Sequence, residues 1–319
     1  MNRALKTERR APAPAAIRQR ISVADAPPAA TVIQHVKDTT DFLKACRAVR
    51  PSARVPAGII ALRLPRRTFE RLREAALAAI QRYGLHGWLS KEGRSAGMYD
   101  SLSLTFNPDL RDPGITDVHQ STLGTSVNPE REFFYGSTRR FTRLKNTYFD
   151  TYGFRRPTPA AQSGYLGEFL SQCRLSLVRS RLSMLRAGPD APPAFEVGWH
   201  RDEPVFENLR INIPLTGSPE YLLQLEHERD KPAKNSATMT EHHLEPGVAY
   251  TLDTHRPHRV YASRPSRVDR VHLVLGFSPW LRYDEASDSW TPNEHYGRTH
   301  PFDIACGGGV HPDIRLDAR

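Results

Sequence analysis

The sequence is poor in the residues that build cross-linked or membrane-spanning proteins. Its 319 residues include three cysteines, Cys46, Cys173 and Cys306, which form no Cys-x-x-Cys pair. Neither a disulfide framework nor a thiolate zinc site is therefore expected. No apolar run approaches the roughly 18 residues that a membrane helix needs, and the basic N-terminus lacks the apolar stretch of a secretory signal. We therefore expect a globular protein of the cytoplasm that makes no contact with a membrane.

Lysine is scarce as well, supplying 7 of the 45 basic residues of a chain whose formal net charge is +10. Residues 1–56 hold 11 Lys and Arg against 4 Asp and Glu, whereas residues 57–319 hold 34 against 31. Most of the excess positive charge therefore lies in the leader and the body is nearly balanced, so nucleic acid is not an expected partner. One alternative from another class stays open, a non-catalytic β-barrel protein that binds nucleic acid or a partner through its basic leader. It predicts salt-sensitive association and no metal uptake.

The chain divides into four segments. Residues 1–30 are rich in Pro, Ala and Arg and predict a disordered basic leader. Residues 31–173 predict a mixed helical and α/β elaboration that packs on the core and shapes the substrate pocket. Within it we expect a weak helix at 32–49, a strand at 57–64, a helix at 69–83 that stops at Gly84, a strand at 99–106 and a short helix at 164–173. Residues 281–319 form a C-terminal extension.

The segment from 174 to 280 has a different sequence pattern, in which short runs of strand-forming residues are separated by turn residues. The runs are 174–186, 195–200, 208–215, 220–227, 236–242, 247–253, 257–262 and 270–278. Eight short strands at spacings of about ten residues are typical of an all-β sandwich or barrel. We therefore predict a mainly β protein whose core is a cupin-like jelly roll, also called a double-stranded β-helix.

One cluster of ligand-type residues falls inside this β region. It consists of GWHRDEP, with His200 and Asp202, and LDTHRPHRVY, with His255 and His258. Residues two apart on a strand share a face, so His200 and Asp202 can reach one point, where a second histidine would complete a ligand set. Two imidazoles and one carboxylate are the ligands of non-haem iron(II) oxygenases. We prefer His258 because a strand-like segment follows it, and His255 stays a rival.

An arginine opens the next apolar strand, RVHLVLGFS, at Arg270. Its planar guanidinium is the preferred partner of a carboxylate, and an unpaired charge pointing inward would be costly. Non-haem iron(II) oxygenases that use 2-oxoglutarate need a cation for its distal carboxylate, and Arg270 is expected to fill that role. Arg267 is a rival for the same role. The tandem His242 and His243 are expected on a surface turn.

The stretch from 181 to 277 resembles the aspartyl/asparaginyl β-hydroxylase family of iron- and 2-oxoglutarate-dependent dioxygenases. The matching pieces, in the order of the family, are RLSMLRAG (181–188), GWHRDEP (198–204), NLRINIPL (208–215), PGVAYTLDTHRPHRVYA (246–262) and DRVHLVLGF (269–277). The resemblance implies a double-stranded β-helix that uses Fe(II), 2-oxoglutarate and O2. His200, Asp202 and His258 would hold the iron. Arg270 would bind 2-oxoglutarate, with Ser183 and Arg210 as helpers and Asn212 as a weaker candidate that would need a strand bulge.

The presence of Asp202 distinguishes this chain from the animal members of that family, which lack the carboxylate ligand, and places it nearer to the bacterial amino-acid hydroxylases. The resemblance implies hydroxylation of an amino acid or peptidyl residue, with succinate and CO2 as co-products, and a tailoring step in natural-product biosynthesis would suit such an enzyme. Desaturation, epoxidation or ring closure of a small molecule is an alternative on the same fold. An Arg- and aromatic-rich stretch that includes Arg139, Arg140, Arg143, Tyr148, Tyr152 and Arg155 is a candidate to meet a substrate carboxylate or to be solvated surface. The sequence does not predict the oligomeric state.

Overall fold

The structure is a computed structural model that describes residues 39–53, 55, 58–87, 89–90, 93–94, 99–108, 116–122, 151–187, 195–217, 219–227, 238–262 and 264–316. The predicted leader, residues 1–30, lies outside the described residues, as do Arg139, Arg140, Arg143 and Tyr148. In the described part, no helix combines the length and apolar character that crossing a bilayer would require. The three cysteines are free, and burial raises the pKa of the Cys46 and Cys173 thiols to about 12.

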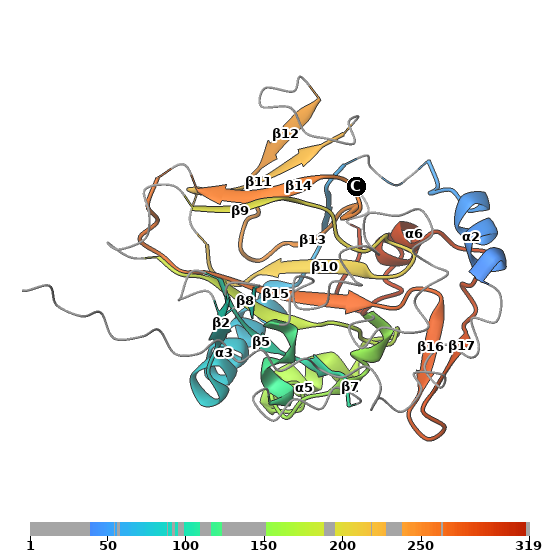
Figure 1. Ribbon diagram of the computed structural model, residues 1–319, viewed down its shortest axis with the longest axis horizontal. Helices are drawn as coiled ribbons and strands as arrows, with labels where there is room; N and C mark the ends of the chain where they lie inside the picture. The colour runs from blue at the N-terminus through green and yellow to red at the C-terminus, as the bar shows by residue number, and fades with distance from the viewer. Residues whose placement is uncertain are drawn as a thin grey trace, which may run out of the picture.

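Eight strands between residues 181 and 277 form the centre of the molecule, and each matches one of the predicted β-rich runs. They are β8 (Arg181–Leu185), β9 (Phe195–His200), β10 (Leu209–Pro214), β11 (Tyr221–Glu226), β12 (Met239–His242), β13 (Ala249–Thr251), β14 (His258–Ala262) and β15 (Arg270–Phe277). β8, β10, β13 and β15 belong to one sheet, and β9, β11, β12 and β14 to the other. The two sheets face each other (Figure 1). This crossing back and forth between two antiparallel sheets is the jelly roll, or double-stranded β-helix, that the sequence predicts.

The N-terminal segment widens one of these sheets. β1 (Ile60–Leu62) pairs with β13, β5 (Tyr99–Ser103) pairs with β8, and β2 (His86–Gly87) pairs with β5. The result is a seven-stranded sheet in the order β1-β13-β10-β15-β8-β5-β2, opposite a four-stranded sheet in the order β12-β11-β14-β9. The remaining short elements of this segment are β3 (Leu89–Ser90), β4 (Gly93–Arg94), β6 (Thr105–Phe106), β7 (Arg156–Pro157) and the 3-10 turns at Asp117–Thr122 and Thr151–Gly153.

Two helices cover the outer face of the seven-stranded sheet: α3 (Arg66–Tyr83) and α5 (Gly164–Ser171) (Figure 1). Apolar residues recur at helical spacing along α3, and Leu72 and Ala76 are fully buried in the main core. The helix stops where the sequence predicts, because Gly84 adopts a φ of 77° and donates its N–H to the Ile80 carbonyl at 2.9 Å. These helices therefore anchor the sheet from outside.

The two faces of the seven-stranded sheet differ in polarity because side chains alternate along each strand. On β10, Ile211 and Ile213 are fully buried in the main core with the helices. Arg210 and Asn212, on the opposite face, line a cavity between the two sheets. Alternation alone places both there, so the strand bulge expected for Asn212 is not needed. The polar face of a core strand is thus turned toward the interior of the jelly roll.

The C-terminal extension closes one side of the molecule with a hairpin and a short helix. β16 (Leu281–Asp284) pairs with β17 (Ser289–Pro292), α6 spans Pro301–Cys306, and α2 (Thr39–Ala48) lies beyond α6 (Figure 1). Trp290 and Ile304 of this extension belong to the main core. Residues 281–316 are therefore part of the same folded unit as the jelly roll.

Candidate functional site

A cavity of about 100 Å³ opens between the two sheets. Its lining comes entirely from β8–β15 and their connections: Arg181, Ser183, His200, Asp202, Arg210, Asn212, Leu223, Leu244, Leu252, Thr254, His258, Val260, Arg270, His272 and Val274. All six site residues expected from the sequence line it. The pocket-shaping role expected of residues 31–173 stays a prediction, because their central stretch lies outside the described residues.

Two histidines and an aspartate converge at one end of this cavity. His200 ends β9 and His258 begins β14, and the two are cross-strand partners. Asp202 follows β9 in the next loop, where its N–H donates to the Thr254 carbonyl at 2.8 Å. The Asp202 Oδ2 atom lies 3.9 Å from His200 Nε2 and 3.5 Å from His258 Nε2. One ligand atom from each of the three residues lies within 4.8 Å of the others.

The backbone fixes which ring nitrogen each histidine presents. His200 Nδ1 lies 2.7 Å from the Gly198 carbonyl oxygen, and His258 Nδ1 lies 2.9 Å from the Arg256 carbonyl oxygen. A carbonyl only accepts, so each Nδ1 donates its N–H, and Nε2 is the ring nitrogen left for a metal. In both rings Nε2 is the nitrogen that lies near Asp202. Metal-binding histidines are usually oriented by this kind of outer hydrogen bond.

Burial and nearby charge favour the metal-binding forms of Asp202 and His200. Burial alone would raise the pKa of Asp202, but the Arg210 guanidinium, with His258 and His200, outweighs burial and holds this pKa well below its usual range. Burial lowers the pKa of His200 despite the nearby Asp202 carboxylate. At neutral pH the site therefore offers a neutral imidazole at His200 and a carboxylate anion at Asp202.

Asp202 belongs to a partly buried network of ion pairs that includes Arg210 and Glu203. Arg210 donates through Nη1 to Asp202 Oδ2 and through Nη2 to Glu203 Oε2. Glu203 is 3% exposed, lies 3.6 Å from Arg179 Nη1, and accepts a hydrogen bond from Thr151 Oγ1 at 3.1 Å. Arg210 is thus shared between two carboxylates, which fixes its side chain. Glu203 and its contacts were not expected from the sequence, where it is only the residue after Asp202.

The residues expected to bind the co-substrate lie on the opposite sheet. Arg270 begins β15 and Ser183 is in the middle of β8, and both line the cavity. Arg267, the rival for the carboxylate, is exposed and is not part of the cavity lining. The cavity therefore has a possible metal-ligand set at one place and a guanidinium at another. A co-substrate such as 2-oxoglutarate, which has a chelating end and a distal carboxylate, would require both.

The structure also shows where three other residues singled out in the sequence lie. His255 stands outside the ligand cluster, and its Nδ1 lies 3.2 Å from the Asp202 carbonyl oxygen, so it braces the loop. His242 ends β12 instead of lying on a turn. Arg155, a candidate for a substrate carboxylate, is buried and binds Asp288 through Nε at 2.8 Å and Nη2 at 2.9 Å, away from the cavity.

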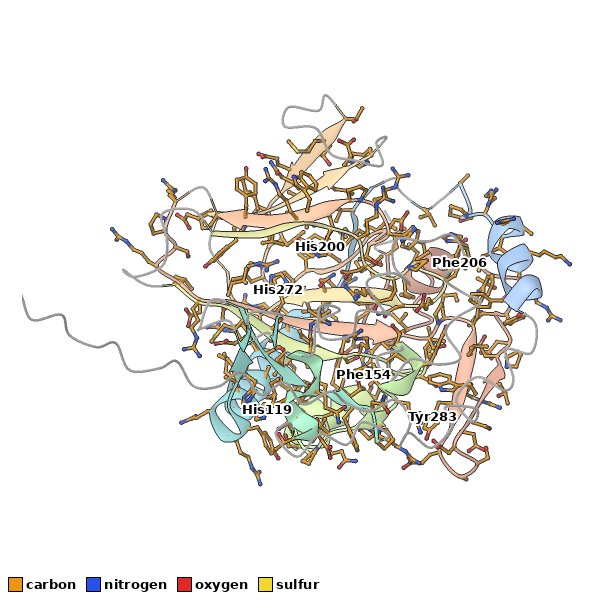
Figure 2. The ribbon with its side chains drawn as sticks, viewed as in Figure 1. His119, Phe154, His200, Phe206, His272 and Tyr283 are labelled. Atoms are coloured by element: carbon orange, nitrogen blue, oxygen red, sulfur yellow. The ribbon has the colours of Figure 1, made fainter. Side chains whose placement is uncertain are left out.

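The cavity also contains polar residues that the sequence analysis did not single out. Arg181 precedes Ser183 by two positions on β8, and His272 follows Arg270 by two on β15. Both could have been predicted from the sequence, because side chains alternate along a strand and a residue two positions from a candidate shares its face. In Figure 2, His200 and His272 come from opposite sheets and lie on either side of the space between them.

The donor set fits a divalent transition metal. Two ligand atoms each about 2.1 Å from one ion stand roughly 3 to 3.5 Å apart for angles between a right angle and a tetrahedral one. The separations of 3.5 and 3.9 Å need only small side-chain adjustments to meet this. A metal held by two imidazoles and one carboxylate would keep further coordination positions for other ligands.

No protein-family model matches the chain, and no curated protein does. Among solved structures, it is similar to the non-haem alpha-ketoglutarate-dependent epimerase SnoN from nogalamycin biosynthesis (11% identity, 77% of this chain and 84% of that chain, TM-score 0.37). It is also similar to an oxidoreductase of the 2OG-Fe(II) oxygenase family from Burkholderia pseudomallei (14%, 76% and 90%, 0.34). A third is a prolyl-4-hydroxylase from Pseudomonas putida (15%, 69% and 92%, 0.30). Similarities of this size establish no shared activity, so function must be argued from the site.

Proposed function

We propose that this chain is an Fe(II)- and 2-oxoglutarate-dependent oxygenase that hydroxylates an unactivated carbon of an amino acid or peptidyl residue. One observation supports this most: His200, His258 and Asp202 present two oriented Nε2 atoms and one carboxylate oxygen within 4.8 Å of one another, facing a cavity. Two histidines and a carboxylate in a facial arrangement are typical of non-haem Fe(II) oxygenases.

The residues of the chain have separate tasks in this proposal. His200, Asp202 and His258 hold the iron. When bound, the iron would supply activation of O2, with 2-oxoglutarate converted to succinate and CO2 and one oxygen atom delivered to the substrate. Arg210 was expected to help bind 2-oxoglutarate; its contacts with Asp202 and Glu203 support a role in holding the carboxylate ligand in place.

The co-substrate would lie along the inner face of the seven-stranded sheet. Arg270 would receive its distal carboxylate in a charge-assisted pair, and Ser183 faces the same space from β8. Five apolar side chains complete the lining: Leu223, Leu244, Leu252, Val260 and Val274. They would exclude water from the neighbourhood of a bound metal, which would protect a reactive site from side reactions.

The substrate class is inferred from the sequence resemblance to the aspartyl/asparaginyl β-hydroxylase family. The presence of Asp202 supports a relationship to its bacterial amino-acid hydroxylases, and a tailoring step in natural-product biosynthesis is a suitable setting. The partner proposed is a small molecule or a peptide. Hydroxylation is the simplest outcome of hydrogen removal from such a carbon.

The experiment compares two histidines three positions apart. Mn(II) and then 2-oxoglutarate are titrated calorimetrically into the wild-type chain and into His258→Ala and His255→Ala. We expect metal and co-substrate binding in the wild type and in His255→Ala, and loss of metal binding in His258→Ala. Iron-loaded wild type should also form succinate slowly without substrate, and faster with the correct member of a panel of amino acids and peptides, whose product is identified by mass spectrometry.

Absence of 2-oxoglutarate binding to the metal-loaded wild type would overturn the proposal. Equal metal binding by His258→Ala and the wild type would overturn the assigned ligand set.

A further inference from the structure

His272 is a buried histidine in the cavity that the proposed reaction does not use. It lies in β15, two residues beyond Arg270, and is 3% exposed. Its cross-strand partners are Ser183 on β8 and Pro214 on β10. Val271 and Leu273, on either side of it, turn to the main core, so the imidazole faces the cavity with Arg270.

The imidazole has an unsatisfied nitrogen. His272 Nε2 is buried and has no hydrogen-bond partner among the described residues. The great majority of buried polar side-chain atoms have a partner, so an exception needs an explanation, and here it belongs to a residue that lines the cavity. Ser183, the cross-strand neighbour, lines the same cavity, so the unsatisfied nitrogen lies beside residues already proposed to bind the co-substrate.

The protonation state of His272 decides what it can offer. Burial, and then the charges of Arg270 and His243, hold its pKa well below the ordinary value. At neutral pH the ring therefore carries a single N–H. The Arg270 guanidinium attracts anions, whose oxygens only accept hydrogen bonds, so a group seated between Arg270 and His272 requires Nε2 to be the donor.

We propose that His272 donates a hydrogen bond through Nε2 to the carboxylate held by Arg270, so that Arg270, His272 and Ser183 together form the distal carboxylate site. This inference rests on the proposed function and adds a binding residue to it. A neutral donor adds a hydrogen bond without adding a second positive charge next to the guanidinium. One guanidinium and two neutral donors match a singly charged carboxylate, which favours a dicarboxylate over a phosphorylated co-substrate.

The test measures binding without turnover. 2-Oxoglutarate is titrated into Mn(II)-loaded wild type, His272→Leu, which removes the donor, and His272→Gln, which keeps a side-chain N–H. We expect the dissociation constant of 2-oxoglutarate to rise about 10- to 100-fold in His272→Leu, since a hydrogen bond to a charged group is lost. His272→Gln should stay within about 3-fold of the wild type, and Mn(II) affinity should be the same in all three proteins.

A second ligand separates the carboxylate contact from general damage to the cavity. 2-Oxopentanoate has a methyl group in place of the distal carboxylate, and its binding to the Mn(II)-loaded proteins is measured by competition. Its affinity should be unchanged by His272→Leu. Equal weakening of both ligands in His272→Leu, or equal binding of 2-oxoglutarate by all three proteins, would overturn the role of His272. Failure of the wild type to bind 2-oxoglutarate would instead overturn the proposed function.

Discussion

Arg210 and Asp202 form an ion pair that joins the two sheets of the jelly roll, because Arg210 lies on β10 of the seven-stranded sheet and Asp202 follows β9 of the four-stranded one. The same guanidinium also binds Glu203. The position of the carboxylate in the histidine cluster is therefore set by a residue that is not a member of the cluster.

Removing this guanidinium should weaken metal binding without changing any ligand. In Arg210→Met, Asp202 loses its fixed orientation and Glu203 loses a buried counter-charge. Residues that orient metal ligands usually contribute about 10- to 100-fold to affinity, and we expect a loss of that size, measured by Mn(II) calorimetry. Arg201→Met is the matched control, because Arg201 donates to the His255 carbonyl at 3.3 Å and is not part of the cavity lining. Equal Mn(II) affinity in both variants would contradict the assignment.

Arg270 and Arg267, which are three positions apart in the sequence, allow the carboxylate site to be tested with two matched variants. Arg270 lines the cavity and Arg267 is exposed. Arg270→Met should weaken 2-oxoglutarate binding by about 100-fold or more, because a charge-assisted pair in a buried site is lost. Arg267→Met should bind as the wild type does. Calorimetry on the Mn(II)-loaded proteins gives both numbers, and a larger effect at Arg267 would reverse the roles.

The Arg155–Asp288 pair should contribute to stability rather than to catalysis. The Arg155 side chain is 1% exposed, and the Asp288 side chain 40%. The hydrogen bond from Arg155 lowers the pKa of Asp288 to about 2. Asp288→Asn leaves a buried guanidinium with a weaker partner and should cost about 1–3 kcal/mol in urea unfolding. Glu285→Gln, which breaks the neighbouring but exposed pair with Arg156, should cost no more than about 0.5 kcal/mol.

His272 should make stability depend on pH below neutrality. Its pKa is lowered in the folded chain, so below the ordinary value near 6.5 the unfolded chain takes up a proton that the folded chain does not. The contribution of His272 to stability is therefore fully present above pH 6.5 and is lost progressively as the pH drops. Urea unfolding between pH 7 and pH 5 should show a smaller loss of stability in His272→Gln than in the wild type. Parallel losses would show that His272 titrates normally.

Substitution by alanine should lower the stability of the fold at one glycine of the jelly roll and leave it nearly unchanged at another. A Cβ on Gly276 of β15 would lie 2.1 Å from the Val178 carbonyl oxygen, whereas one on Gly198 of β9 would meet nothing within 4 Å. Gly276→Ala should therefore cost about 3 kcal/mol or more, since backbone must move. Gly198→Ala should be close to neutral. Thermal or urea unfolding of both variants tests this.

The strands of the jelly roll could be predicted because their pattern is local. Alternation and turn residues located all eight, and β9 was predicted with its observed bounds, Phe195–His200. The pairing of strands could not be predicted from local pattern, because β5 and β8 meet across about 80 residues of sequence. The addition of β1, β2 and β5 to the sheet depends on that long-range pairing.

The metal-type cluster could be predicted for the same reason, since His200 and Asp202 are close in sequence and only His258 required a distant contact. Glu203 could not, because nothing local distinguishes a buried acidic residue from a solvated one before Arg179 and Arg210 are brought to it. His272 was within reach of alternation, but its burial and its unsatisfied nitrogen exist only in the folded chain.

The seven-stranded sheet ends in a short strand at each edge, β1 with three residues and β2 with two. An incoming extended chain would find only one or two main-chain groups at either end in the described part of the molecule. Long regular edges are the templates for aggregation and for strand addition, and very short ones prevent both. This sheet is therefore terminated by its own N-terminal segment, which protects the protein against edge-to-edge polymerisation.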